Sequence, residues 1–138
     1  MRLRISASVF PTEDKEKVLR ALQNIFPDID FNEGHDNGDT VVLRGELTNP
    51  ENMAFSQFQE LLRHRKIRDS VEALLHRNYA DGKTRLELNK QAAFIGRLNI
   101  AEKHPLGSIM IEIECEKEQI HEIVWGAASQ KETLDEKE

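Results

Sequence analysis

Two short segments carry the side chains best suited to bind a ligand. One is Asn89-Lys90-Gln91, which follows an alternating stretch and places two amides beside a cation at the expected end of a strand. Amides and a cation held together suit phosphate groups or base edges. The other is the densest basic run, Arg63-His64-Arg65-Lys66-Ile67-Arg68. Its arginines suit phosphate because a planar guanidinium fork can bind two phosphate oxygens at once. Both segments therefore predict contacts with a phosphate-rich ligand.

Each segment also has an interpretation that needs no ligand. Asn89, Lys90 and Gln91 can form a polar turn between two strands, in which the amides satisfy loop carbonyls. The basic run can be a solvated helix face that acidic neighbours such as Glu60 and Glu72 balance. A bend within the run would instead fan its guanidinium groups outward. The expected strands supply further cations, which are Arg2, Arg4, Arg85 and Arg97.

The sequence contains no recognisable catalytic motif. The five histidines, at positions 35, 64, 76, 104 and 121, lack metal-ligand spacing. Glu112, Glu114 and Glu116 occupy alternate positions, which favours an exposed strand face over a carboxylate site. A Walker loop, a GxSxG motif, a CxxC pair and a dinucleotide fingerprint are all missing. We therefore expect no catalytic residue, no bound metal and no cofactor.

Composition and charge favour a globular protein of the cytoplasm with one basic side. The chain has 138 residues, of which 38% are hydrophobic and 32% charged, and its formal net charge is −6. Residues 60–103 carry 10 basic and 6 acidic side chains, whereas residues 104–138 carry 3 basic and 9 acidic ones. No apolar run approaches the roughly 18 residues of a membrane helix, and no export signal is apparent. The single cysteine, Cys115, fits a reducing compartment and a buried structural thiol.

Hydrophobic periodicity predicts an α+β fold with the order β-α-β-β-α-α-β-β-β-α and helices on one face of a mostly antiparallel sheet. Alternation predicts strands at 2–10, from 29, and at 41–47, 83–89, 97–100 and 109–116. Helical spacing predicts helices at 12–26, 55–62, 67–78 and 120–127, with a break near Arg65-Lys66. Thr12 is the expected N-cap of the first helix, and Asn37-Gly38 predicts a hairpin turn. We expect one domain at 1–128 and a charged, disordered tail at 129–138.

Three stretches resemble a known family. They are Ile5 through Pro11-Thr12-Glu13-Asp14, Leu61-Leu62-Arg63-(x)3-Ile67, and above all Leu88-Asn89-Lys90-Gln91-Ala92-Ala93-Phe94-Ile95-Gly96. The chain resembles, over about residues 3–115, an archaeal family of uncharacterised proteins that has been called predicted RNA-binding or exosome-associated. That family is similar in fold to a large-subunit ribosomal protein of the L-five type. The resemblance implies the α+β fold and an RNA partner, and it implies no catalytic residue.

The leading hypothesis is a cytoplasmic, non-enzymatic RNA-binding module that acts in RNA processing or on ribosomal RNA. One alternative is a protein-interaction or homodimerisation module that uses a sheet edge and the acidic strand at 109–116. Another is an enzyme for which this domain supplies only part of a site. Phe94 is expected in the core rather than as a stacking platform. The residues expected to bind RNA are Arg2, Arg4, Arg63, Arg65, Lys66, Arg68, Asn89, Lys90, Gln91 and Arg97.

Overall fold

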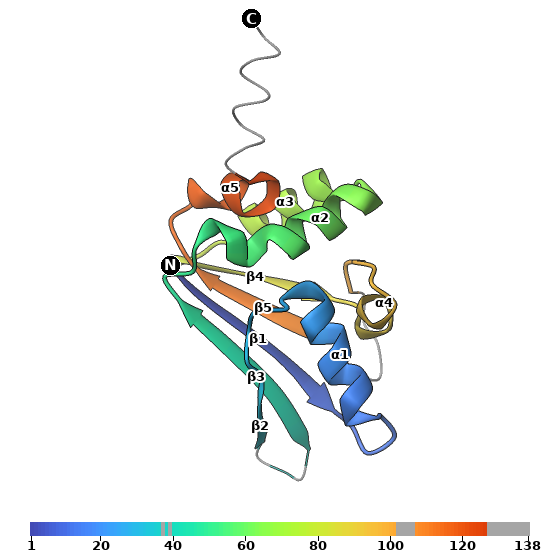
Figure 1. The fold of residues 1–138 in the computed structure, drawn as a ribbon. Coiled ribbons are helices and arrows are strands. Elements are labelled where there is room, and N and C mark those ends of the chain that lie inside the picture. The colour runs from blue at the N-terminus through green and yellow to red at the C-terminus, as the bar shows by residue number, and fades with distance from the viewer. Residues whose placement is uncertain (37, 39, 102–106, 127–138) are drawn as a thin grey trace, which may run out of the picture.

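The computed structural model describes residues 1–36, 38, 40–101 and 107–126. Within these residues one sheet has the strand order β2-β3-β1-β5-β4, and every neighbouring pair is antiparallel. Figure 1 shows the helices along one side and one end of this sheet, so the α+β fold class is confirmed. The strands are β1 (Arg2–Val9), β2 (Asn32–His35), β3 (Val41–Thr48), β4 (Lys83–Leu88) and β5 (Ile109–Glu114). The helices are α1 (Lys15–Ile25), α2 (Ser56–Arg65), α3 (Arg68–Arg77), α4 (Lys90–Phe94) and α5 (Gln119–Trp125), and a 3-10 turn, η1 (Asn52–Phe55), precedes α2.

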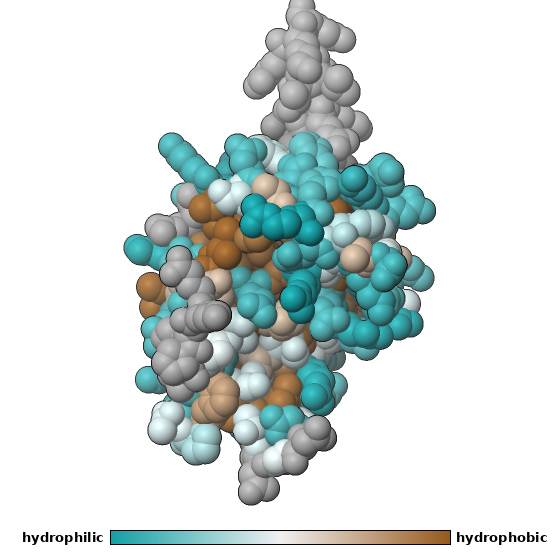
Figure 2. Space-filling model, turned by 180° about the vertical axis from the view of Figure 1, so that it is seen from behind, coloured by the Kyte–Doolittle hydropathy of each residue, from teal (hydrophilic) through white to brown (hydrophobic). Residues whose placement is uncertain are grey.

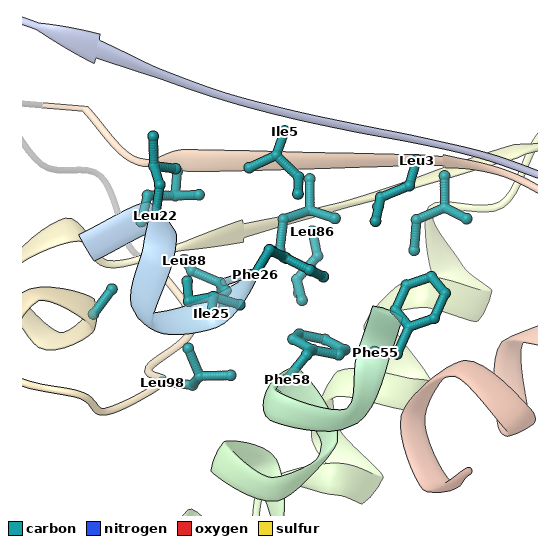
Figure 3. Packing of buried hydrophobic residues seen from close by; sticks show 14 of the residues in the cluster. Leu3, Ile5, Leu22, Ile25, Phe26, Phe55, Phe58, Leu86, Leu88 and Leu98 are labelled. Atoms are coloured by element: carbon teal, nitrogen blue, oxygen red, sulfur yellow. The ribbon is translucent and has the colours of Figure 1, made fainter. Parts of the chain in front are cut away.

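One face of the sheet is apolar because alternate strand residues point toward the helices. In β1, Leu3 and Ile5 are buried, whereas Arg4 between them is exposed on the opposite face. Figure 3 shows Leu3 and Ile5 on the same side as Phe26, which follows α1, and Phe58 of α2. The rings of Phe26 and Phe58 stack with their centroids 5.8 Å apart. This core fixes the helices on one face and leaves a charged face on the other.

Cys115 continues the buried side of β5, as the alternation of Ile109, Ile111 and Ile113 predicts. It is 9% exposed, and the Tyr79 hydroxyl donates a hydrogen bond of 2.8 Å to its backbone carbonyl. Burial raises the pKa of the Cys115 thiol, which disfavours the reactive thiolate at neutral pH. The expected buried thiol is therefore confirmed.

A sharp bend separates α2 from α3, which confirms the predicted break near Arg65-Lys66. Lys66 has a left-handed backbone, with φ 54° and ψ 39°. Its N–H donates to the carbonyl of Arg63 at 3.2 Å, and the N–H of Ile67 donates to the carbonyl of Leu62 at 3.4 Å. These bonds pair carbonyls that the end of a helix would otherwise leave unsatisfied. The left-handed conformation of Lys66 and these two hydrogen bonds thus fix the change of direction between α2 and α3.

The segment after β4 differs from the prediction. No strand forms at 97–100, where only an isolated bridge joins Leu88 to Ile100. The chain instead forms α4, which has 5 residues and begins directly after Asn89. The Asn89 side chain accepts a hydrogen bond of 2.9 Å from the Ala92 N–H, which makes Asn89 a helix N-cap rather than part of a polar turn. A helix this short lacks the repeated apolar spacing by which sequence patterns reveal helices.

Two element boundaries also differ. The N-cap of α1 is Asp14, whose carboxylate accepts a 2.9 Å hydrogen bond from the Glu16 N–H, and not Thr12. β2 begins at Asn32, because the apolar residues before it pack over Gly45 of β3 instead of joining the sheet. A Cβ at position 45 would collide with the side chains of Ile29 and Phe31.

Three predictions fall wholly or partly outside the described residues. These are the turn residue Asn37, the end of the helix predicted at 120–127, and the tail at 129–138. The hairpin itself is confirmed, since β2 and β3 pair with His35 opposite Val41. The single-domain boundary stays a prediction. In the described part of the chain, no helix is both long and apolar enough to span a bilayer.

Candidate nucleic-acid interface

The bend between α2 and α3 gathers cations at one corner of the molecule. We call Arg63, Lys66 and Arg68 the basic corner; the side chain of Arg65 is outside the described atoms. Arg63 Nη2 lies 2.6 Å from Glu60 Oε1, and His64 Nε2 lies 3.1 Å from the same oxygen. The hydrogen bond from Arg63 lowers the pKa of Glu60, which is therefore ionised at neutral pH. Lys66, at the turn itself, is exposed.

The basic corner continues onto α5 through an aromatic side chain. The Arg68 guanidinium carbon lies 4.7 Å from the centroid of the Trp125 ring, and the His121 ring stacks on Trp125 with centroids 5.8 Å apart. Trp125 Nε1 donates a hydrogen bond of 2.7 Å to Glu72 Oε1 on α3. Arg68 is thus placed by an aromatic ring 57 residues away in the chain, which is a spacing that no local sequence pattern predicts.

Glu72 joins α3 to α5 and is the half-buried acid of this region. Its carboxylate accepts from Trp125 and lies 3.1 Å from His121 Nδ1 and 3.6 Å from His76 Nε2. Burial is the largest single influence and would raise the pKa of Glu72. The hydrogen bonds from His121 and Trp125, together with the charges of His121 and His76, outweigh it and lower that pKa overall.

The lowered pKa of Glu72 predicts a specific loss of stability in acid. A carboxyl whose folded-state pKa is depressed stabilises the fold above its unfolded pKa, and this stabilisation disappears as pH falls through the folded pKa. We expect Glu72→Gln to cost about 1–2 kcal/mol at pH 7, because it removes charge-assisted hydrogen bonds. Urea unfolding at intervals from pH 7 downward should show this difference shrinking below about pH 4.5. A difference that stays constant to pH 3 would contradict the assignment.

The Asn89-Lys90-Gln91 segment has a geometry other than the expected exposed rim. Lys90 is only 6% exposed, and its Nζ donates to the Ser8 carbonyl at 2.6 Å and pairs with Glu13 Oε1 at 3.0 Å. Glu13 Oε1 also accepts from the Phe10 N–H at 3.0 Å. Lys90 therefore fastens α4 to the end of β1 and the turn before α1. Among the three residues of the segment, only Gln91 is exposed, and Asn89 is half-buried.

The open face of the sheet carries the arginines expected on β1, but acids face them from both neighbouring strands. One row across four strands reads Glu46, Arg4, Glu112 and Arg85. Arg2 pairs with Glu46 at 3.2 Å and with Glu114 at 3.9 Å. Figure 2, from behind, shows hydrophilic residues interspersed with smaller apolar areas. Because acids and arginines alternate across this row, the face is close to electrically neutral rather than basic.

Exposed cations that sequence reasoning missed lie where α1 and α4 are side by side (Figure 1). Lys17 Nζ and Arg20 Cζ on α1 lie 5.8 Å and 6.0 Å from the centroid of the Phe94 ring on α4. Arg97, which was expected, is exposed just after this helix, and its N–H donates to the Ala92 carbonyl at 2.9 Å. The only sequence signal for Lys17 and Arg20 was their spacing of one helical turn on the polar side of α1.

The described residues include no cluster of three or more His, Cys, Asp or Glu side chains suited to a metal ion.

The residues expected to bind RNA are divided among three places. Arg63, Lys66 and Arg68 lie at the basic corner, Arg2 and Arg4 lie on the open sheet face, and Gln91 and Arg97 lie at the two ends of α4. Asn89 and Lys90 hold α4 in place.

Comparison with known proteins identifies the family. A family model described as RNA binding matches residues 2–115. A UPF0201 protein of Thermococcus onnurineus is 38% identical over 115 residues, which cover 83% of each chain. A UPF0201 protein of Methanopyrus kandleri is 35% identical over 129 residues, covering 89% of this chain and 81% of the relative. The crystal structure of a UPF0201 protein from Methanococcus jannaschii superposes with a TM-score of 0.76 at 28% identity, covering 91% of this chain and 93% of that one.

The matched residues include the three stretches that resemble the family, which lie on β1, at the α2–α3 bend and on α4. The likeness to a large-subunit ribosomal protein stays a prediction. The extent of the match and the identity of these relatives show that the chain belongs to the RNA-binding family that includes the archaeal UPF0201 proteins.

Proposed function

We propose that this protein is a non-enzymatic RNA-binding module of the cytoplasm, and that its basic corner binds RNA phosphates. The observation that carries the proposal is the position of Arg63, Lys66 and Arg68 at and on both sides of one bend, in a chain whose family is described as RNA binding. Cations fanned from a bend suit the phosphate backbone, which attracts proteins regardless of base sequence. A role on ribosomal RNA or in RNA processing would follow from this activity.

The net charge at the basic corner supports this proposal. Arg63 and His64 share one acid, the Glu60 carboxylate, and the Glu72 carboxylate is engaged by Trp125 and His121. Arg68 lies against Trp125 rather than against an acid in the described contacts. Arginine on an aromatic ring keeps its outward N–H groups available for phosphate. On the open sheet face, by contrast, Arg2 and Arg4 are already in ion pairs.

Lys66→Gly tests the proposal without weakening the fold. Glycine adopts the left-handed backbone of position 66 more readily than lysine, so we expect the free energy of unfolding to rise by about 0.5–1 kcal/mol. The same change removes one cation. We expect the affinity for RNA to fall several-fold, and the slope of log K against log salt to become shallower by about 0.7–0.9. Fluorescence anisotropy with labelled RNA at a series of salt concentrations measures both effects.

Asp81→Gly is the matched control, because Asp81 is exposed and also has a left-handed backbone, with φ 53°. This variant should gain similar stability, and it should not lose RNA affinity. If Lys66→Gly and the wild type bind RNA with equal affinity, Lys66 does not contact the RNA. If the wild-type protein binds no RNA even at low salt, the nucleic-acid hypothesis fails and the protein-interaction alternative takes its place.

A further inference from the structure

A groove of about 560 Å³ lies between the start of α1 and α4. None of the residues that line it belongs to the basic corner. This volume falls within the range of roughly 300–1,000 Å³ that is usual for small-ligand sites. Its apolar side is formed by Val18, Phe94 and Ile95, and Gln91 contributes an exposed amide. Ile95 is 66% exposed, which is unusual for a large aliphatic side chain beside a concave surface.

The walls of the groove are held in place by two side-chain attachments. At the beginning of α4, Lys90 pairs with Glu13 and donates to the Ser8 carbonyl. At its end, Asn24 Nδ2 of α1 donates to the carbonyls of Ala93 and Phe94 at 2.9 Å and 3.1 Å. The groove is therefore preformed, and a ligand would not need to order it.

The cations beside the groove are positioned for an anion. Lys17 and Arg20 both approach the half-buried Phe94 ring, and neither has an acidic partner among the described ion pairs. The Glu13 carboxylate is neutralised by Lys90, and the Asp14 carboxylate caps α1. Phe94 packs against the core as expected, but it is only half-buried, and both cations lie over its ring. A partly accessible aromatic ring with cations over it and an amide nearby can stack a base, bind its phosphate and hydrogen-bond its edge.

We propose that this groove binds an unstacked nucleotide of single-stranded RNA. The base would lie against Phe94 and Ile95, Gln91 would contact the base edge, and Lys17 and Arg20 would bind the adjoining phosphates. Arg97, exposed beyond the other end of α4, would extend the phosphate path. An A-form duplex hides its base faces, so the groove accepts single strands and not the stem of a helix.

This inference rests on the proposed function and adds to it a site and a preference. The basic corner accounts for attraction to any RNA backbone, whereas the groove accounts for selection of single strands. The two sites make different contributions, so their variants should behave differently.

The test compares a single-stranded RNA of about ten nucleotides with the blunt duplex of the same sequence, by anisotropy titration. Wild type should bind the single strand more tightly than the duplex. Phe94→Leu, which keeps an apolar side chain against the core, should weaken single-strand binding about tenfold and leave duplex binding unchanged. Gln91→Glu, at an exposed position, should also weaken single-strand binding because it brings a carboxylate into the groove.

Lys17→Gln combined with Arg20→Gln should make the salt slope for the single strand shallower by roughly 1.4, or about 0.7 for each lost contact. Lys15→Gln is the matched control in the same helix. Lys15 is paired with Glu33 at 3.2 Å and does not line the groove, so its loss should leave the single-strand preference intact. A melting curve for each variant shows whether it is folded.

Four results would overturn the inference. In the first, neither Phe94→Leu nor Gln91→Glu changes the affinity for the single strand, whereas Lys66→Gly still weakens it. This result would leave the basic corner as the RNA-binding site and exclude the groove. Another is equal wild-type affinity for the single strand and the duplex. The third is displacement of the RNA by uridine monophosphate as effectively as by the unlabelled RNA, which would assign the groove to a free nucleotide. Absence of all RNA binding would reject the groove and the basic corner together.

Discussion

Lys90→Met should destabilise the protein by about 3 kcal/mol, because it removes one partner of a buried ion pair. The Lys90 side chain is 6% exposed and that of Glu13 is 12% exposed, so water solvates neither group well. Without the ammonium, the Glu13 carboxylate keeps only the Phe10 N–H among its described donors, and the Ser8 carbonyl loses a bond of 2.6 Å. The melting temperature should fall by roughly 10 °C, as measured by circular dichroism or calorimetry.

A double-mutant cycle separates the ion pair from simple loss of packing. Lys90→Met combined with Glu13→Gln should recover part of the lost stability, because the uncompensated carboxylate is gone. The matched control is Lys15→Met, which breaks a pair of similar length, 3.2 Å, between side chains that are 47% and 45% exposed. An exposed pair of this kind contributes at most about 1 kcal/mol. Equal costs at positions 15 and 90 would show that burial of Lys90 does not strengthen its role.

The sequence alone predicted the elements whose periodicity extends over two or more turns or strand repeats. Alternation located β1 and β5, and helical spacing located α2 and α3 together with the bend at Lys66. α4 was missed because 5 residues contain too little repetition to distinguish a helix from a turn. Asn89 was the available signal, since asparagine is favoured at helix N-caps, but it is also favoured in turns.

The chemistry of the candidate site was harder to predict than the fold. Lys90 lies between the polar residues Asn89 and Gln91, and this local context predicted that its side chain would be exposed. Its partners Ser8 and Glu13 are 82 and 77 positions away in the chain. The contact of Phe94 with Lys17 and Arg20 is similarly long-range. Such pairings arise from the packing of α4 on α1, which no local pattern encodes.

The charge of the open sheet face also could not be predicted from a local sequence pattern. A strand pattern places Arg2 and Arg4 on one face of β1, which predicts a basic surface. Register decides what lies opposite, and here it pairs Arg4 with Glu46 of β3 and Glu112 of β5. A shift of one residue in either pairing would replace an acid by a residue of the other face. The face is neutral because of register, and this conclusion can be tested directly.

Replacing Glu46 and Glu112 by glutamine together should raise the affinity for RNA about tenfold at low salt. The change frees the Arg4 guanidinium from its ion pair with Glu46 and removes the acid that lies between Arg4 and Arg85 in the sheet register. Arg2 would also lose its 3.2 Å partner. The slope of log K against log salt should become steeper by about one to two units as new phosphate contacts form. Stability should change by no more than about 1 kcal/mol, since the pairs on this face are solvent-exposed.

Glu116→Gln combined with Glu118→Gln provides the control for net charge. Both of these acids are exposed between β5 and α5, and neither faces an arginine in the sheet register. This control raises the net charge by the same amount as the sheet-face variant, but it should increase RNA affinity only slightly, because no ready-made row of arginines is released. If both double variants bind RNA equally well, the effect is one of total charge, and the paired acids do not mask a latent RNA-binding face. If only the sheet-face variant gains affinity, the register that places Glu46 and Glu112 beside Arg4 is what confines RNA to the helical side of the molecule.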